Sequence, residues 1–166
     1  EVARSLAAAD DVTAGLKAVI LGLCESEGWD TGRYFRVDEA AGGLRFVDGW
    51  SVNEPSVDHF VERSRMVWQS GKPVWSAEIE TRQGGFAFAV LSGGKAIGVL
   101  AFSGSVVRPP DERLQQAARV IGSQVGQFLQ RKQAEENLRE GEARFRSLTQ
   151  MSSDFFWETD PNHRFV

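Results

Sequence analysis

The sequence predicts an α+β sandwich, in which an antiparallel sheet has helices on both faces and a long helix follows at the C-terminus. Three observations lead to this class. Apolar residues recur with a helical period near the N-terminus, in the middle and through the C-terminal third. Two pairs of strand-like segments are each joined by a short turn that contains glycine. The last pair is apolar on both alternating faces, so it is expected at the centre of the sheet, covered on both sides.

The first predicted helix begins near Val12 and ends at Gly28. Asp10 or Asp11 can cap its start, because a short acidic side chain accepts hydrogen bonds from the first free N–H groups, and glycine commonly ends a helix. Its apolar residues return every three or four positions, which places them on one face. This face holds Val12, Leu16, Val19, Ile20 and Leu23.

The strands are expected in two hairpins with a second helix between them. "TGRYFRVD" and "GLRFVDGWSV" are rich in aromatic and β-branched residues and are separated by "EAAGG". "EPSVDHFVERSRM" then has the pattern of an amphipathic helix with a proline in its first turn. A turn in "SGKPVWS" leads to a short strand. The second hairpin joins "GFAFAVL" and "KAIGVLAFSG" through "SGG".

One long helix is predicted from Asp111, its N-cap, to about Gln150, because no proline occurs before Pro161. Two apolar series follow it with steps of four and three residues, and they differ in phase by one residue near Arg131 and Lys132. The first half is expected to pack on the sheet or on a partner, and the second half only on another helix. We therefore predict a parallel homodimer. Its seam would hold Leu114, Ile121, Val125, Phe128, Leu138, Phe145 and Leu148, with Ala118, Ala134 and Gly141 completing the two series.

Composition excludes several classes of partner. The formal net charge of −4 provides no basic field for nucleic acid or an anionic membrane. The longest apolar run, "FAFAVL", is too short to cross a bilayer, and the N-terminus lacks the order of a signal peptide. The single cysteine, Cys24, excludes an intramolecular disulfide and favours a reducing compartment, so a cytoplasmic location is expected. Because it begins at Glu1 and stops abruptly at Val166, the chain is expected to be a piece of a longer protein.

Four phrases in this order resemble a GAF domain over about residues 6–129: "GWDTGRYFRVDEAAGGLRFVDGW", "SGKPVW", "GGKAIGVLAFSG" and "LQQAARVIGSQVGQFL". The resemblance is to the GAF group on the N-terminal side of bacterial sensor kinases and diguanylate cyclases. It implies a sensor fold in residues 1–130. It also implies a place in two-component or cyclic di-GMP signalling.

The C-terminal part resembles the region where such proteins pass into a PAS domain. "RKQAEENLREGEARFRSL" is similar to the linker helix that precedes PAS domains, and "MSSDFFWETDPNHRFV" is similar to a first PAS strand and hairpin. The resemblance implies a coiled-coil linker in residues 131–150 and the start of a PAS domain in residues 151–166. The long charged helix would then couple a GAF sensor to a PAS module.

The chain departs from similar GAF domains in the segments that would close a ligand pocket. Only "SRMVWQ" stands where a longer glycine-rich loop is usual, and "SAEIETRQGG" is also short. Any cavity there is expected to be small or open. Aromatic residues near the strand ends would line it for a planar ligand, or they would instead fill the core. These candidates are Tyr34, Trp50, Trp68, Trp75 and Phe88.

No catalytic or metal-binding set emerges from the sequence, and no cofactor is expected. Cys24 could attach a bilin or act as a redox switch, but a buried structural thiol fits its place on an apolar helix face. His59 is a candidate haem ligand or a surface histidine, and His163 falls in the PAS-like segment. "SGGKAIG" lacks the first glycine and the Ser/Thr of a phosphate-binding loop.

Three functional hypotheses follow. The first is a non-catalytic sensory domain that passes a signal through the helical linker to a downstream PAS and output module, a diguanylate cyclase or histidine kinase. The second is a structural dimerisation module whose pocket is filled by its own side chains. The third is an enzyme. Some GAF-like proteins reduce methionine sulfoxide, but they use several cysteines and this chain has one.

Overall fold

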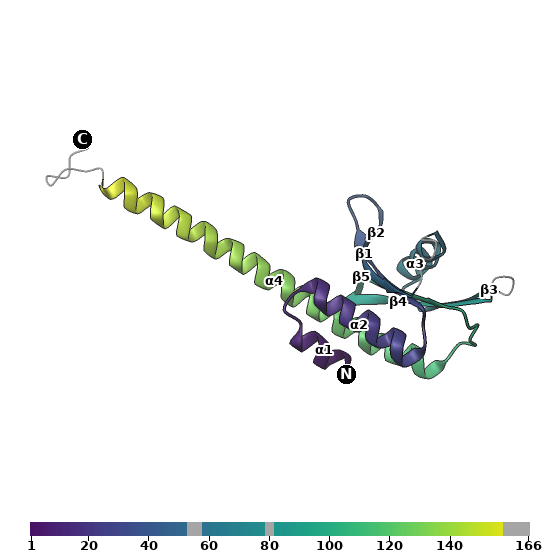
Figure 1. Cartoon of the computed structure of the whole chain (residues 1–166). Helices are drawn as coiled ribbons and strands as arrows, with labels where there is room; N and C mark the ends of the chain where they lie inside the picture. Colours follow the sequence, from purple (N-terminus) through teal and green to yellow (C-terminus); the bar gives the residue numbers. More distant parts are fainter. Residues whose placement is uncertain (53–57, 79–81, 158–166) are drawn as a thin grey trace. The chain divides into compact units, whose positions relative to one another are not determined.

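The computed structural model describes residues 1–52, 58–78 and 82–157 (Figure 1). The chain forms two compact units, Glu1–Gln130 and Arg131–Val166. Along the chain the elements are α1 (Val2–Ala8), α2 (Val12–Glu27), β1 (Thr31–Asp38), β2 (Gly43–Ser51), α3 (Asp58–Ser70), β3 (Val74–Glu78), β4 (Gln83–Ser92), β5 (Lys95–Gly104) and α4 (Glu112–Trp157).

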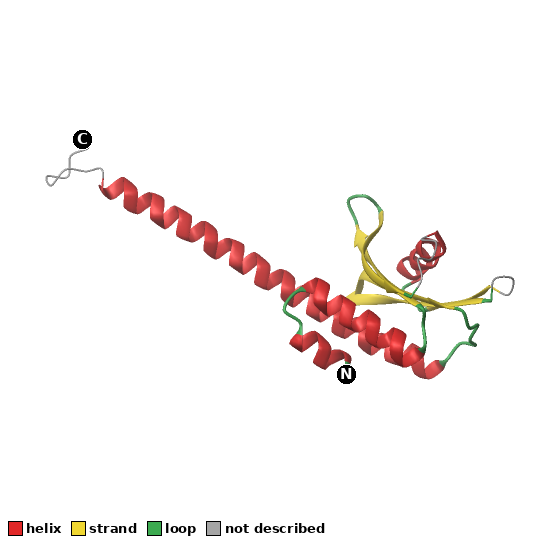
Figure 2. Ribbon diagram, viewed as in Figure 1, coloured by secondary structure: helices red, strands yellow, loops and turns green. Residues whose placement is uncertain are grey.

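The first unit is built on a five-stranded sheet of order β2-β1-β5-β4-β3, in which every neighbouring pair is antiparallel. Figure 2 shows α3 on one side of this sheet, and α1, α2 and the start of α4 on the other. β5 lies in the middle, where Leu100 is paired with Tyr34 of β1 and with Phe88 of β4. The predicted α+β class with an antiparallel sheet and helices on both faces is therefore confirmed.

The two faces of the sheet carry side chains of different size. The face toward α2 and α4, here called the α2 face, presents Phe86, Phe88, Leu100 and Phe102 to the principal core cluster. The face toward α3, here called the α3 face, presents Phe35 and several small residues to Phe60 and Val67 of α3. These small residues are Ala87, Ala89 and Ala101. The larger side chains of the sheet therefore lie on the α2 face.

Helix α4 lies against the edge of β4 that β3 leaves open. β3 pairs with β4 only as far as Ala87, so the strand beyond this point has no β3 residue beside it. A Cβ added to Gly122 would overlap the Ala89 carbonyl oxygen, and one added to Gly126 would overlap the Leu91 carbonyl oxygen. Only glycine permits this approach, because any side chain would meet strand backbone.

Several boundaries differ from the prediction. Helix α1 was not predicted, because seven residues are too few to show a period, although its Leu6 is buried in the core. Helix α3 extends to Ser70, so "SRMVWQ" is helical and is not a remnant of a loop. Helix α4 extends to Trp157, past the predicted end near Gln150. The strand expected from Met151 is thus helical as far as Trp157, and the rest of the PAS-like segment lies outside the described residues.

Candidate functional site

The structure does not bring the five predicted ligand residues together. Tyr34, Trp50, Trp75 and Phe88 all belong to the cluster on the α2 face. Trp68 packs on the opposite, α3 face. Because the sheet separates them, these residues cannot line one pocket. Trp75, Phe86, Phe88 and Phe102 form a ladder of ring contacts with centroids 4.3, 5.5 and 6.1 Å apart. This ladder favours the core-packing alternative for the candidates on the α2 face.

Two titratable groups in this core are held in their neutral forms. Burial raises the pKa of the Tyr34 phenol to about 12, and the nearby positive charge of Arg36 opposes this only in part. Burial also raises the pKa of the Cys24 thiol to about 12, with further contributions from the charges of Asp30 and Glu25. A thiol is a poor nucleophile and a poor redox centre unless it ionises. Cys24 therefore has the environment of a structural residue.

Two arginine side chains, those of Arg33 and Arg63, lie on the α3 face. The Arg33 guanidinium lies 5.4 Å from the Phe46 ring and 5.2 Å from the Phe60 ring, both measured to the ring centroid. Arg63 of α3 donates from Nη1 to the Phe102 carbonyl oxygen at 3.2 Å. Contacts with aromatic rings and a backbone carbonyl thus hold the two guanidinium groups in place.

Glycines of the sheet make room for both arginines. A Cβ added to Gly85 would overlap the Arg63 guanidinium, and one added to Gly49 would lie 3.1 Å from Arg33 Cγ. The Ser64 hydroxyl of α3 is fully buried and has no hydrogen-bond partner among the described residues. The cavity prediction itself stays a prediction, because residues 79–81 lie outside the described part.

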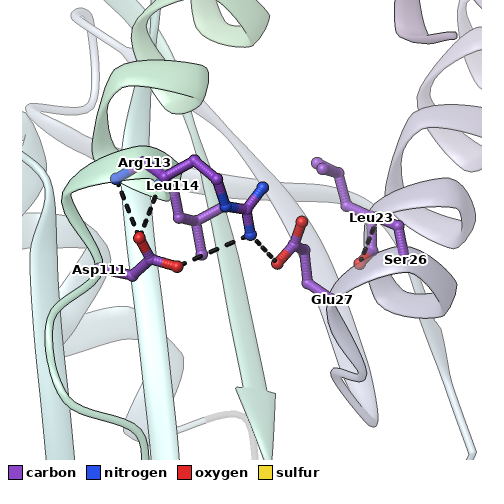
Figure 3. A network of polar contacts seen from close by, with 6 residues as sticks. All are labelled: Leu23, Ser26, Glu27, Asp111, Arg113 and Leu114. Carbon is purple, nitrogen blue, oxygen red and sulfur yellow. Dashed lines mark hydrogen bonds and ion pairs between the residues drawn. The ribbon is translucent and has the colours of Figure 1, made fainter.

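A polar clasp joins the end of α2 to the start of α4 (Figure 3). Asp111 caps α4 as predicted, since its Oδ1 accepts from the Arg113 and Leu114 backbone N–H groups at 2.9 and 3.4 Å. The Arg113 guanidinium reaches Asp111 at 3.6 Å and Glu27, the last residue of α2, at 3.1 Å. Asp11 caps α2 in the same way by accepting from Ala14. These contacts connect the C-terminal end of α2 with the N-terminal end of α4.

A second set of contacts strengthens this junction. The Arg108 guanidinium lies 5.0 Å from the Trp29 ring centroid. Asp30 Oδ2 accepts a hydrogen bond from the Ser105 backbone N–H at 2.7 Å. Both contacts join the chain just after α2 to the connection between β5 and α4. The start of α4 is therefore fixed to α2 and to the sheet.

The predicted dimer seam divides into two parts with different surroundings. Leu114, Val125 and Phe128 are at most 5% exposed and belong to the core of their own chain, and Ile121 is partly buried against it. These four side chains pack against their own chain, so the prediction that they form part of a dimer seam needs correction. Leu138, Phe145 and Leu148 are 66%, 71% and 63% exposed.

The exposed part of the seam contains an open hollow of about 350 Å³. Gly141 forms its floor because it contributes no side chain, and nothing lies within 4 Å of a Cβ added there. The hollow is lined by Asn137, Leu138, Gly141, Glu142, Phe145 and Arg146. An apolar stripe with a hollow at a glycine is a surface that fits another helix.

Within residues 1–52, 58–78 and 82–157, no group of three or more His, Cys, Asp or Glu side chains could hold a metal ion. No helix in the same residues has both the length and the apolar character to cross a membrane. Nothing is described of the His59 side chain, and His163 lies outside the described residues.

Solved structures share this fold. A free methionine-R-sulfoxide reductase from Neisseria meningitidis gives a TM-score of 0.69 at 15% identity, over 81% of this chain and 87% of its own. The GAF domain of a phosphoenolpyruvate-protein phosphotransferase from Acinetobacter gives 0.69 at 14% identity, over 82% and 92%. Residues 122 to 287 of a methyl-accepting chemotaxis protein give 0.62 at 14% identity, over 80% and 96%. No protein-family model and no curated protein sequence matches the chain. The chain therefore has a GAF-type fold.

Proposed function

We propose that this chain is a non-catalytic sensory domain that works as a homodimer and passes a signal through α4 to a downstream PAS and output module. The output module would be a diguanylate cyclase or a histidine kinase. The observation that carries this proposal is the double character of α4. Its first half is part of the core of the GAF-type unit, while its second half exposes an apolar stripe with Leu138, Phe145 and Leu148.

Three contacts would let α4 respond to changes in the sensor unit. The clasp at Asp111 and Arg113 fixes its start to Glu27 of α2. The glycine contacts at 122 and 126 hold its next turns against the β4 backbone. A shift of the sheet or of α2 would therefore move or rotate the helix. Packed helices respond to such shifts by switching between a few discrete arrangements.

Two other functions are less well supported. A structural dimerisation module without a ligand is favoured by one observation, namely that Arg33 and Arg63 already occupy space on the α3 face. A methionine sulfoxide reductase would need a reactive thiolate, and the only cysteine is buried, with its pKa raised to about 12. This chain thus shares the scaffold of the reductase but does not present a reactive thiolate.

A thermal-shift screen separates the sensor from the structural module. Small carboxylates, phosphates and nucleotides are the first compounds to test, because the α3 face holds two guanidinium groups. A ligand at 100 times its Kd stabilises the folded state by about 2.7 kcal/mol. We expect this stabilisation to disappear in Arg63→Met and to persist in Arg65→Met, whose side chain forms an exposed ion pair with Glu62. If no compound stabilises the chain, the structural module becomes the better account.

A further inference from the structure

We propose that Arg63 couples helix α3 to the start of α4 by way of β5. This coupling rests on the proposed sensory function, because it is the route by which a change at α3 reaches the helix that continues into the second unit. Figure 2 shows α3 and the start of α4 on opposite sides of the sheet. A change at α3 must therefore cross the sheet before it reaches α4, and β5, the middle strand, is where it crosses.

Arg63 contacts two neighbouring strands close to the end of β5. Its Nη1 donates a hydrogen bond to the carbonyl oxygen of Phe102 at 3.2 Å. Its guanidinium lies so close to Gly85 of β4, the partner of Ser103, that a Cβ there would overlap it. The Phe102 ring lies on the other side of the sheet, in the core cluster of the α2 face. One residue of β5 therefore contacts α3 through its backbone and the α2 face through its side chain.

The apolar part of the α3 contact is shallow. Phe60 and Val67 of α3 pack on small residues of the sheet, namely Ala87, Ala89 and Ala101. Small side chains interdigitate little, so they specify the position of the helix only weakly. Ser64 lies on the same helix face, and its buried hydroxyl has no partner among the described residues. Because an unpaired buried hydroxyl is unfavourable, it opposes this position of α3, and the directional bond from Arg63 holds the helix there.

The end of β5 is bonded on both sides of Gly104 to the chain that follows α2. The Asp30 N–H donates to the Ser103 carbonyl oxygen at 3.0 Å. Asp30 Oδ2 accepts from the Ser105 backbone N–H at 2.7 Å. A shift of the Phe102 carbonyl, one residue before these bonds, would therefore move Asp30 and the end of α2 with it.

The clasp drawn in Figure 3 continues these contacts to α4. Arg113 joins Glu27, the last residue of α2, to Asp111, the N-cap of α4. Arg108, between β5 and α4, lies over the Trp29 ring. The contacts thus run from α3 through β5 to the first turn of α4. A line of contacts becomes a coupling only if a change at one end alters the energy of a contact at the other, and this can be measured.

A double-mutant cycle between Arg63→Met and Asp30→Ala measures this energy. If Arg63 holds the end of β5, its loss lets this end relax, and the bond from Ser105 to Asp30 contributes less to stability. In urea, the equilibrium constant of unfolding of the double variant should be at least about fivefold below the value expected from multiplying the two single effects. Arg65→Met, which removes an exposed arginine of the same helix, is the matched control. Its cycle with Asp30→Ala should be multiplicative within about twofold.

Amide exchange supplies a readout that a merely space-filling Arg63 would not change. In Arg63→Met the Ser105 amide, which donates to Asp30, should lose about tenfold of its protection. The amide of Val19, a buried residue of α2, should change by about twofold or less. Arg63→Lys should restore most of the protection at Ser105, because its ammonium can donate to the same carbonyl oxygen. An arginine that only fills space would lower the protection of both amides by the same factor.

Every outcome decides the role of Arg63. A coupled cycle with selective loss at Ser105 establishes the route through β5. A multiplicative cycle, or an equal loss at Ser105 and Val19, overturns it and leaves Arg63 with a structural role. If Arg63→Met does not fold, Arg63→Gln, which keeps an amide donor, replaces it in both measurements under the same criteria. The search for a stabilising compound uses the unmodified chain, so a failure of the sensory role is recognised separately.

Discussion

Gly126→Ala is a sharp test of how α4 is held against the sheet. In an ordinary exposed helix this substitution stabilises the fold by up to about 1 kcal/mol, because alanine is the better helix former. Here the added Cβ would overlap the Leu91 carbonyl oxygen, whereas a tolerated C···O contact is about 3.3 Å or longer. The helix must therefore move away from β4 by roughly 1 Å or more. Such overpacking costs about 3 kcal/mol, so the expected net loss is about 2 kcal/mol.

The matched control is Gly22→Ala in α2, where nothing lies within 4 Å of the new Cβ. Urea unfolding and thermal unfolding at one fixed protein concentration measure the free energy of unfolding and the melting temperature of both variants, since dimerisation makes stability concentration-dependent. We expect Gly22→Ala to be neutral or stabilising and Gly126→Ala to lower the melting temperature by about 4–8 °C. If Gly126→Ala is as stable as Gly22→Ala, the close packing of α4 on the β4 edge is wrong.

Three further predictions concern single groups. Folding raises the pKa of Cys24 from 9.0 to about 12, so the contribution of its neutral thiol to stability is complete below pH 9 and is lost between pH 9 and 12. The free energy of unfolding should therefore decline less steeply across that window in Cys24→Ala than in the unmodified chain. An equally steep decline would contradict the burial of the thiol. Asp111→Ala should cost about 1 kcal/mol in urea unfolding, like Asp11→Ala at the other cap, and a loss below about 0.3 kcal/mol would show that the cap is dispensable. Leu138→Asp should convert the dimer to monomer in sedimentation while circular dichroism shows a folded GAF-type unit; a persistent dimer would place the interface elsewhere.

The sequence was sufficient to predict the sheet and most helices because their patterns are local. The glycine turns at 42 and 43 and at 93 and 94 set both hairpins, and Asp11 and Asp111 begin their helices as predicted. Helix α1 has too few residues to show a period, and its place depends on burial of Leu6 in the core. The resemblance to a PAS domain predicts a strand from Met151, but no proline occurs before Pro161, and α4 continues to Trp157.

The candidate site was predicted less well because strand faces depend on pairing register. Trp68 and Trp75 are close in sequence, yet they pack on opposite faces of the sheet. The two arginines on the α3 face were missed as site residues. Their signal was present in the glycines, since Gly49 and Gly85 stand where a side chain would collide with Arg33 and Arg63. Without the register, however, nothing in the sequence connects Gly85 with Arg63.

Transmission through α4 is tested most directly by changing the phase of the helix in the full-length protein. Seven alanine-rich residues inserted after Arg139 lengthen the seam by one heptad and keep its phase, whereas three inserted residues rotate everything beyond them by roughly 300° about the helix axis. The proposal predicts that output activity responds to the sensor's ligand in the seven-residue variant and does not respond in the three-residue variant. Equal responses in both variants would show that the signal does not travel through this helix.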